Sequence, residues 1–119
     1  LVHGYEEWGD AFVDRLNGQF ACAVWDARAR RLTLLRDRAG ILPLHYRIGD
    51  GRLWFASEVK SLLATMPSAP RLDPIALDQI FTGWTAASPR TIFAGVREVP
   101  PGHRLVLHSG EIRVSPYWA

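Results

Sequence analysis

Residues 19–35 read QFACAVWDARARRLTLL, and this stretch decides the fold class. Two apolar runs, residues 20–25 and 32–35, lie on either side of a short polar segment at 26–31. Apolar runs joined by a polar turn predict a β-hairpin. Both alternating sets of side chains in the first run are apolar, which predicts a strand covered on both faces.

The segment before this hairpin predicts one helix over residues 1–16. Its apolar side chains recur at three- and four-residue steps, so they lie on one face. The members of this face are Tyr5, Trp8, Phe12, Val13 and Leu16. Gly9 is a weak point within the helix. Asn17-Gly18 is expected to end it, because both residues tolerate the left-handed conformation found at helix ends.

The segment after the hairpin predicts a second hairpin, formed by residues 44–48 and 53–56. The Gly-Asp-Gly sequence at 49–51 has the chemistry of a tight turn. Ser57 is predicted to cap a short helix that runs to Leu63.

A longer helix is predicted to begin at Asp73 and end near Gly83. Aspartate is a favourable helix cap, and Pro74 at the first helical position loses no hydrogen bond. The side chains that this helix is expected to bury are Ile75, Leu77, Ile80 and Phe81.

The last third of the chain predicts a short strand at 91–93 and a final hairpin. Residues 105–107 and 112–114 form its strands, and Ser109-Gly110 turns the chain between them. The order of helix, four strands, helices and hairpin predicts an α+β layered domain.

Composition limits the classes of function. The chain is 48% hydrophobic and 22% charged, which is typical of a globular domain with a sizeable core. Its formal net charge is only +2, its arginines are scattered and Lys60 is its sole lysine, so no nucleic-acid-binding face is predicted. No apolar run approaches the roughly 20 residues that span a bilayer. Cys22 is the single cysteine, which excludes an internal disulfide and favours a reducing, cytoplasmic location.

A dense charge cluster, Arg36-Asp37-Arg38, follows the second strand of the first hairpin. Two neighbouring guanidiniums keep a carboxylate ionised, so Asp37 is a poor acid–base catalyst. We expect it to accept hydrogen bonds from backbone N–H groups and to hold its loop. A direct contact with a ligand is the alternative. Gly40 would allow a positive φ or a close backbone approach.

Other reactive side chains give no catalytic or metal-binding pattern. Cys22 lies mid-strand between alanines, which predicts a buried, inert thiol. The four histidines lack the spacing of metal ligands, so no metal site is predicted. Glu58 and Lys60 are interpreted as charges at a helix start.

Five stretches occur together, in the same order, in a known family. They are RLNGQFACAVWD at 15–26, RLTLLRDRAGILPLHY at 31–46, LWFASEVKSLL at 53–63, TIFAGVREVPPGHRLVL at 91–107, and Tyr-Trp at 117–118. In these stretches the chain resembles the class II glutamine amidotransferase domain of glutamine-hydrolysing asparagine synthetases. The RDRAGILPL element is specific to class II amidotransferases, and the PPGH and YW elements narrow the resemblance to the asparagine synthetase branch.

The resemblance implies a four-layer αββα sandwich of the N-terminal-nucleophile hydrolase class, with residues 1–119 forming the C-terminal half of that domain. In this family an N-terminal cysteine attacks the side-chain amide of glutamine, and ammonia passes through a tunnel to a synthetase domain. There ATP and Mg²⁺ activate aspartate, which ammonia converts to asparagine. Residues 91–119 are expected to lead towards that domain. No cofactor is expected within the chain itself, and a homodimer of the longer protein is a further expectation.

The resemblance carries over a scaffold and not a catalytic centre. It assigns the loop motif to Arg36, Asp37, Arg38, Gly40, Ile41, Pro43 and Leu44. It assigns a downstream motif to Ser57, Glu58 and Lys60. The positions of Gln19 and Ile41 line the mouth of the ammonia tunnel in the family. The nucleophile and the glutamine contacts are expected upstream of Leu1, so the isolated chain is expected to be inactive.

Departures from the family pattern indicate a divergent member. They are Gln19 for a common methionine, Cys22 for a common phenylalanine, Ala39 for a larger residue and Leu42 for lysine. One alternative is a divergent relative, such as a β-lactam-forming synthetase, that has lost glutaminase activity. The other is a non-catalytic β-rich binding module that displays Trp25, Trp54 or Trp84 on one face.

Overall fold

The computed structural model describes residues 1–118, which fold as two compact units. Unit 1 combines residues 1–41 with the C-terminal segment that begins at Pro101, and unit 2 comprises residues 42–100. Each unit contains one antiparallel sheet with helices beside it, so the α+β prediction is confirmed.

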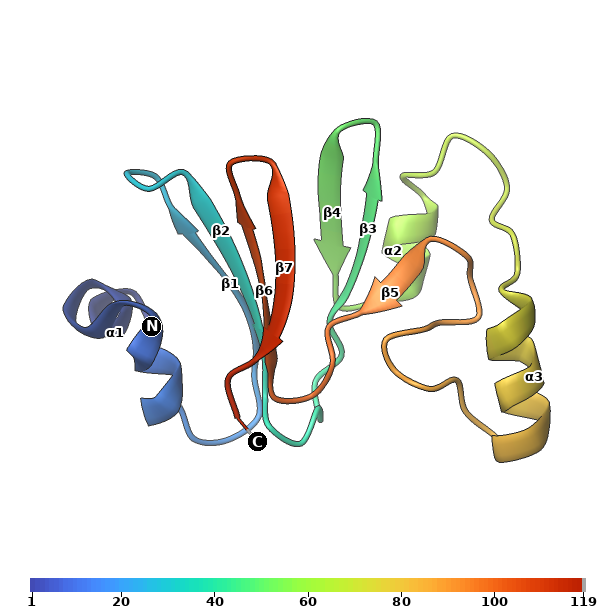
Figure 1. Ribbon diagram of the computed structural model, residues 1–119, viewed down its shortest axis with the longest axis horizontal. Coiled ribbons are helices and arrows are strands. Elements are labelled where there is room, and N and C mark those ends of the chain that lie inside the picture. The colour runs from blue at the N-terminus through green and yellow to red at the C-terminus, as the bar shows by residue number, and fades with distance from the viewer. Residues whose placement is uncertain (119) are drawn as a thin grey trace. The chain divides into compact units, whose positions relative to one another are not determined.

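The sheet of unit 1 has four strands in the order β1-β2-β6-β7 (Figure 1). Its strands are β1 (Ala21–Asp26), β2 (Arg31–Arg36), β6 (His103–His108) and β7 (Glu111–Pro116). The two predicted hairpins are therefore confirmed, and β2 pairs with β6 to join them. The β6–β7 turn is a two-residue loop, in which Ser109 and Gly110 both have positive φ. Such a turn matches the natural twist of a hairpin.

The helical part of unit 1 differs from the prediction of one helix over 1–16. It consists of α1 (Val2–Trp8) and a 3-10 helix, η1 (Gly9–Arg15). The break occurs at Gly9, whose φ of 55° and ψ of −137° lie outside the helical region and are readily adopted only by glycine. Phe12 and Val13 of η1 are nonetheless buried, as predicted, against Leu35 of β2.

One face of the four-stranded sheet is covered by these helices. Partly buried Cys22 and Val24 on β1 pack against the core cluster that η1 completes. The opposite face is apolar in every strand, as the register and the alternation of side chains require. Its members are Ala23, Trp25, Leu32, Leu34, Leu105, Leu107, Ile112 and Val114. The expectation that both faces of β1 are covered is wrong, because Ala23 is exposed and Trp25 is 61% exposed.

The sheet of unit 2 has three strands in the order β4-β3-β5. They are β3 (His45–Gly49), β4 (Arg52–Ala56) and β5 (Val96–Glu98). The second predicted hairpin is confirmed, with Asp50 and Gly51 both at positive φ in its two-residue turn. The strand predicted at 91–93 is wrong. The chain there makes only an isolated bridge between Phe93 and Leu72, and the paired strand begins at Val96.

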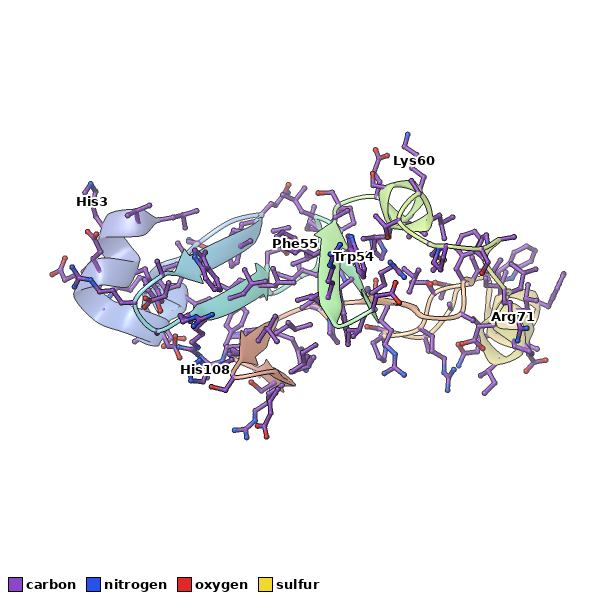
Figure 2. All side chains as sticks on the ribbon, turned by 90° about the horizontal axis from the view of Figure 1, so that it is seen from above. His3, Trp54, Phe55, Lys60, Arg71 and His108 are labelled. Carbon is purple, nitrogen blue, oxygen red and sulfur yellow. The ribbon has the colours of Figure 1, made fainter. Side chains whose placement is uncertain are left out.

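A helix again accompanies one face of this sheet. Arg47 of β3 stacks over the ring of Trp54, with its guanidinium carbon 4.2 Å from the ring centre. Arg47 also donates to the Thr65 hydroxyl at 2.8 Å, just beyond α2 (Val59–Leu63). Trp54 and Phe55 are neighbours on β4 (Figure 2), so they point to opposite faces. The face away from Arg47 therefore carries Tyr46, Ile48, Leu53 and Phe55.

Helix α3 (Pro74–Gly83) begins and ends as predicted. The Asp73 carboxylate accepts hydrogen bonds from the N–H groups of Ile75 and Ala76. The predicted buried face is wrong in part: Ile75 and Phe81 are exposed, Leu77 and Ile80 are half-buried, and Ala76 is the buried residue.

The predicted cap of α2 is also wrong. Glu58, and not Ser57, stands at the N-cap position, and no side chain bonds to the free N–H groups there. The carbonyl oxygen of Ser57 lies 3.2 Å from Nδ1 of His45.

Candidate functional site: the loop after strand β2

Asp37 lies at the centre of the predicted loop motif and is 1% exposed. Its carboxylate accepts a hydrogen bond from the N–H of Ile41 at 3.0 Å. Its own N–H donates to the carbonyl of Phe20 at 2.8 Å, and its carbonyl accepts from Gly40 and Gly102. The expectation that this carboxylate binds backbone N–H and holds the loop agrees with this geometry.

Arg36 joins the start of the loop to Gly40 through its side chain. Its guanidinium donates to the carbonyl of Gly40 at 2.9 Å, and the residue is 7% exposed. Its backbone carbonyl accepts a hydrogen bond from the hydroxyl of Tyr117 at 2.5 Å. From the sequence, Tyr117 has no role beyond its place in the Tyr-Trp element. No local pattern signals this contact, because the partners are 81 positions apart.

Gly40 requires both the conformation and the space that only glycine provides. Its φ is 67°, and a Cβ built there would lie 2.5 Å from Cγ of Pro101. Real Cβ atoms do not approach a neighbouring atom so closely, so Pro101 packs directly on the loop. The two features that the sequence analysis offered for Gly40, positive φ and close approach, are therefore both present.

Gln19 and Ile41, the two predicted tunnel-mouth residues, are exposed in the described structure. Ile41 is 55% exposed although it is a large apolar side chain. Asp37 connects the two segments, since it bonds through its N–H to Phe20, the neighbour of Gln19, and through its carboxylate to Ile41. A single buried residue therefore fixes the backbone beside both positions.

The remaining residues of the motif are Arg38, Pro43 and Leu44. The Arg38 side chain is exposed, with its guanidinium carbon 6.0 Å from the ring centre of Trp118 and one nitrogen 3.3 Å from the carbonyl oxygen of Asp14. In unit 2, Pro43 is exposed and Leu44 is buried, and the carbonyl of Leu44 accepts from the N–H of Val99 at 2.8 Å.

The downstream motif has a different character. Glu58 and Lys60 form an ion pair of 3.0 Å in which both side chains are largely exposed, and Figure 2 shows Lys60 extending outward from α2. Ser57 is exposed as well. These three residues lie near a helix start, as interpreted from the sequence.

Cys22 has the environment of a core residue. It packs against the cluster of Phe12, Val13 and Leu35, and burial raises the pKa of its thiol. A raised pKa keeps the thiol protonated, so Cys22 is a poor nucleophile. Within residues 1–118, no three histidine, cysteine, aspartate or glutamate side chains are grouped as metal ligands. Of the helices in the same range, none is both long and apolar enough to cross a membrane.

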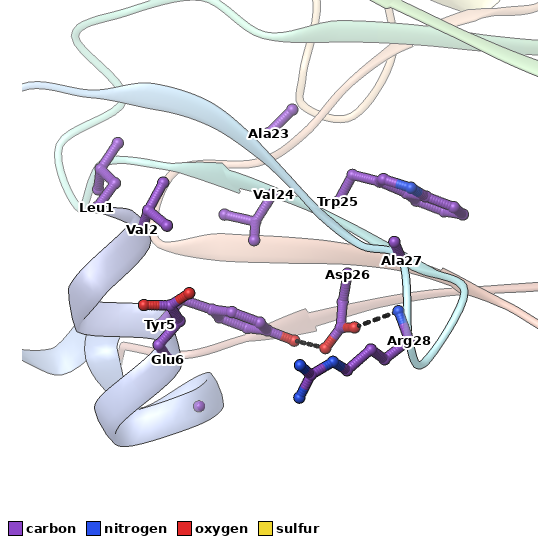
Figure 3. A pocket seen from close by; sticks show the side chains of 11 residues that line it. Leu1, Val2, Tyr5, Glu6, Ala23, Val24, Trp25, Asp26, Ala27 and Arg28 are labelled. Atoms are coloured by element: carbon purple, nitrogen blue, oxygen red, sulfur yellow. Dashed lines mark hydrogen bonds between the residues drawn. The ribbon is translucent and has the colours of Figure 1, made fainter.

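A pocket of about 880 Å³ lies elsewhere in unit 1, between α1 and the edge strand β1 (Figure 3). Tyr5 donates to the carboxylate of Asp26 at 3.1 Å within it, and Asp26 also accepts from the N–H of Arg28. The hydrogen bonds to Ala29 and Tyr5 lower the pKa of Asp26. The lining residues all come from positions 1–28 and include no residue of the loop motif.

Comparison with known proteins decides the family. A sequence profile described as "Glutamine amidotransferase domain" matches residues 1–118. The chain belongs to the glutamine amidotransferase domain family. The family named from the five sequence stretches is thereby confirmed, and the two sheets with their helices agree with a part of its α+β fold.

The chain is also similar to individual proteins, two of them asparagine synthetases and one an amidase. Asparagine synthetase [glutamine-hydrolyzing] 3 of Bacillus subtilis is 38% identical over 99% of this chain and 19% of its own length. Asparagine synthetase [glutamine-hydrolyzing] 2 of the same organism is 37% identical over 100% of this chain and 17% of its own length. Amidase chyE of Penicillium rubens is 38% identical over 96% of this chain and 16% of its own length. The amidotransferase chain thus spans less than a fifth of these relatives.

Proposed function

We propose that this chain is part of an amidotransferase domain that acts within a longer polypeptide, a glutamine-dependent asparagine synthetase. The domain would hydrolyse glutamine, and the ammonia would be used for ATP-dependent amidation of aspartate. The observation that carries the proposal is the family match over residues 1–118, together with 38% identity to a glutamine-hydrolysing asparagine synthetase over nearly the whole chain.

The catalytic thiol in this proposal is not Cys22. An amidotransferase nucleophile must reach its thiolate form, and the half-buried Cys22 has a raised pKa instead. We propose a cysteine outside residues 1–119, as the family resemblance implies. The isolated chain would then release no glutamate from glutamine.

The role of this chain in the reaction would be to shape the path of ammonia. Gln19 and Ile41 would stand at the mouth of the tunnel, and the Asp37 network supports the backbone beside both. Ile41 offers an apolar surface that ammonia crosses without being bound. Gln19 adds a polar group at the same mouth, which fits a divergent member of the family.

ATP and Mg²⁺ are not assigned to this chain. We propose that both bind in a synthetase domain to which residues 91–119 lead. A cytoplasmic location and a homodimer of the longer polypeptide belong to the same proposal.

The test is a pair of assays on the longer polypeptide with glutamine, aspartate, ATP and Mg²⁺. Glutamate and asparagine are expected to form in near-equal amounts. Hydrolysis of glutamine with no asparagine formed would contradict the proposed acceptor. The isolated chain serves as the control, and sustained glutamate release from it would contradict a nucleophile outside residues 1–119.

A second candidate function rests on the fungal relative, which carries the name amidase at 38% identity. A divergent amidotransferase-like domain that forms another amide would share the same loop. Under this alternative the longer polypeptide would consume ATP with a different acceptor and would leave aspartate unchanged in the same assay.

A further inference from the structure

Three segments that are distant in sequence meet at the loop after β2. The first is the loop itself, residues 36–41. The second is the turn at Pro101-Gly102, and the third is Tyr117-Trp118 at the end of the described chain. Gly102 donates to the carbonyl of Asp37 at 2.9 Å, and its own carbonyl accepts from the N–H of Tyr117 at 3.0 Å. The turn therefore lies between the other two segments and bonds to both.

Tyr117 also reaches past the turn to the loop. Its hydroxyl donates to the carbonyl of Arg36 at 2.5 Å, which is short for a hydrogen bond between neutral groups. Burial raises the pKa of the Tyr117 phenol, so the hydroxyl keeps its proton at neutral pH and remains a donor. This bond is a direct link between the C-terminal segment and the start of the loop.

Two further hydrogen bonds connect the backbone at Arg36 and Asp37 to the peptide of Gly40 and Ile41. Arg36, whose backbone Tyr117 holds, donates from its side chain to the carbonyl of Gly40. Asp37, the next residue, accepts the N–H of Ile41. A shift of the backbone at Arg36 would therefore move both anchors of the Gly40–Ile41 peptide. Pro101 lies close to Gly40 on the side where a Cβ would be added, so it limits movement of Gly40 in that direction.

We propose that Tyr117 is a positioning residue for ammonia transfer: its hydroxyl fixes the backbone at Arg36 and so sets the place of Ile41 at the tunnel mouth. The inference rests on the proposed function for its catalytic consequence. The positioning of Ile41 by Tyr117 is argued from the hydrogen bonds alone. In this role Tyr117 acts through Arg36 and Asp37 and needs no contact of its own with glutamine or ammonia.

The experiment replaces Tyr117 by phenylalanine in the longer polypeptide and measures two quantities. The first is free ammonium released per glutamate formed during asparagine synthesis. The second is hydrogen exchange at the Ile41 amide. Loss of one hydrogen bond of ordinary strength changes a local equilibrium by roughly two- to tenfold. We expect Ile41 exchange to accelerate by that factor and the ammonium leak to rise, with kcat/KM for glutamine hydrolysis unchanged.

Tyr5→Phe is the matched control. It removes a tyrosine hydroxyl of the same unit that bonds to Asp26 and not to the loop. Its Ile41 exchange and its ammonium leak are expected to equal those of the wild type. Tyr117→Phe with unchanged Ile41 exchange would overturn the positioning role, whatever reaction the wild type performs. Faster exchange with an unchanged leak would overturn the link to ammonia transfer. A wild type that makes glutamate but no asparagine would count against the proposed function, and the exchange measurement would still decide the positioning role.

Discussion

The two charged motifs identified from the sequence occupy opposite environments. Asp37, in the loop after β2, is 1% exposed and bonds to backbone groups of three segments. Glu58 and Lys60, near the start of α2, pair with each other while both side chains remain largely in solvent. A buried carboxylate that satisfies backbone N–H groups determines the local structure. An exposed ion pair contributes little, because water and salt screen it. The same residue chemistry thus has a structural role in one motif and almost none in the other.

The largest effect is expected for Asp37→Ala. The change leaves the Ile41 N–H without its acceptor and opens a cavity at a fully buried position, so unfolding of the domain should become easier by about 3 kcal/mol. Urea unfolding followed by tryptophan fluorescence measures the loss. Asp37→Asn keeps an acceptor oxygen and should lose less. Equal losses for both variants would show that the charge, and not the Ile41 hydrogen bond, stabilises the loop.

A smaller effect is expected for Gly40→Ala. The substitution combines left-handed backbone strain with a collision against Pro101, together about 2 kcal/mol. Gly51→Ala is a matched control, because Gly51 has a similar φ of 69° and no neighbour within 4 Å of its added Cβ. Its loss should be about 1 kcal/mol, from strain alone. The close packing of the loop on the turn would be contradicted by equal losses at the two glycines in the same urea titration.

The Asp73 side chain is 17% exposed, which lies between buried Asp37 and exposed Glu58, and its contribution to stability can be tested by changing the pH. Hydrogen bonds from the Ala76 N–H, and then the Arg90 side chain, lower its pKa from the ordinary 3.8. A carboxylate with a lowered pKa stabilises the folded state above its unfolded pKa, and this contribution is lost as pH falls through the folded pKa. Amide exchange at Ile75 and Ala76 should therefore quicken below pH 3.8. Asp73→Asn keeps a cap oxygen that does not titrate, so a similar acid response in that variant would exclude Asp73 as the cause.

The smallest effect is expected for Lys60→Ala. The variant removes only the exposed pair with Glu58, so the free energy of unfolding should change by less than about 0.5 kcal/mol. Added salt should abolish even this difference. A loss as large as that of Gly40→Ala in the same urea assay would show that the downstream motif makes a structural contact that its exposure does not suggest.

The sequence predicted those parts of the fold that depend on local chemistry. The turns predicted at Gly49-Asp50-Gly51 and Ser109-Gly110 are both present, and in each hairpin the two central residues have positive φ. Asp73 bonds to the first N–H groups of α3. Gly9 was recognised as a weak point, but the apolar pattern continues past it, so one continuous helix was predicted. The pattern continues because the 3-10 helix η1 also turns Phe12 and Val13 towards the core.

Features that depend on tertiary packing were not predictable in the same way. Trp25 and Phe81 are apolar members of regular patterns, yet both are exposed, since the chain's own helices and strands cover only one face of β1 and α3. For the candidate site, the motif indicated the role of Asp37 and the special conformation of Gly40. The bond from Tyr117 to Arg36 joins positions 81 apart and left no trace in local sequence.

The pairing of β2 with β6 has a consequence for how the domain folds. Residues 42–100 form a separate unit, so the chain must leave unit 1 after Ile41 and return to it at Pro101 before Leu34 can lie beside Leu105. Bringing the ends of so long a segment together costs roughly 3–4 kcal/mol of chain entropy. The hairpins β1–β2 and β6–β7 each join neighbouring segments of the chain, so they should form early. The pairing of β2 with β6, which joins the two hairpins, should be slow. During synthesis on the ribosome, the free edge of β2 would remain open until β6 emerges. A folded unit 2, whose ends are joined by the hydrogen bond from the Val99 N–H to the Leu44 carbonyl, would then lower the entropy cost of pairing β2 with β6.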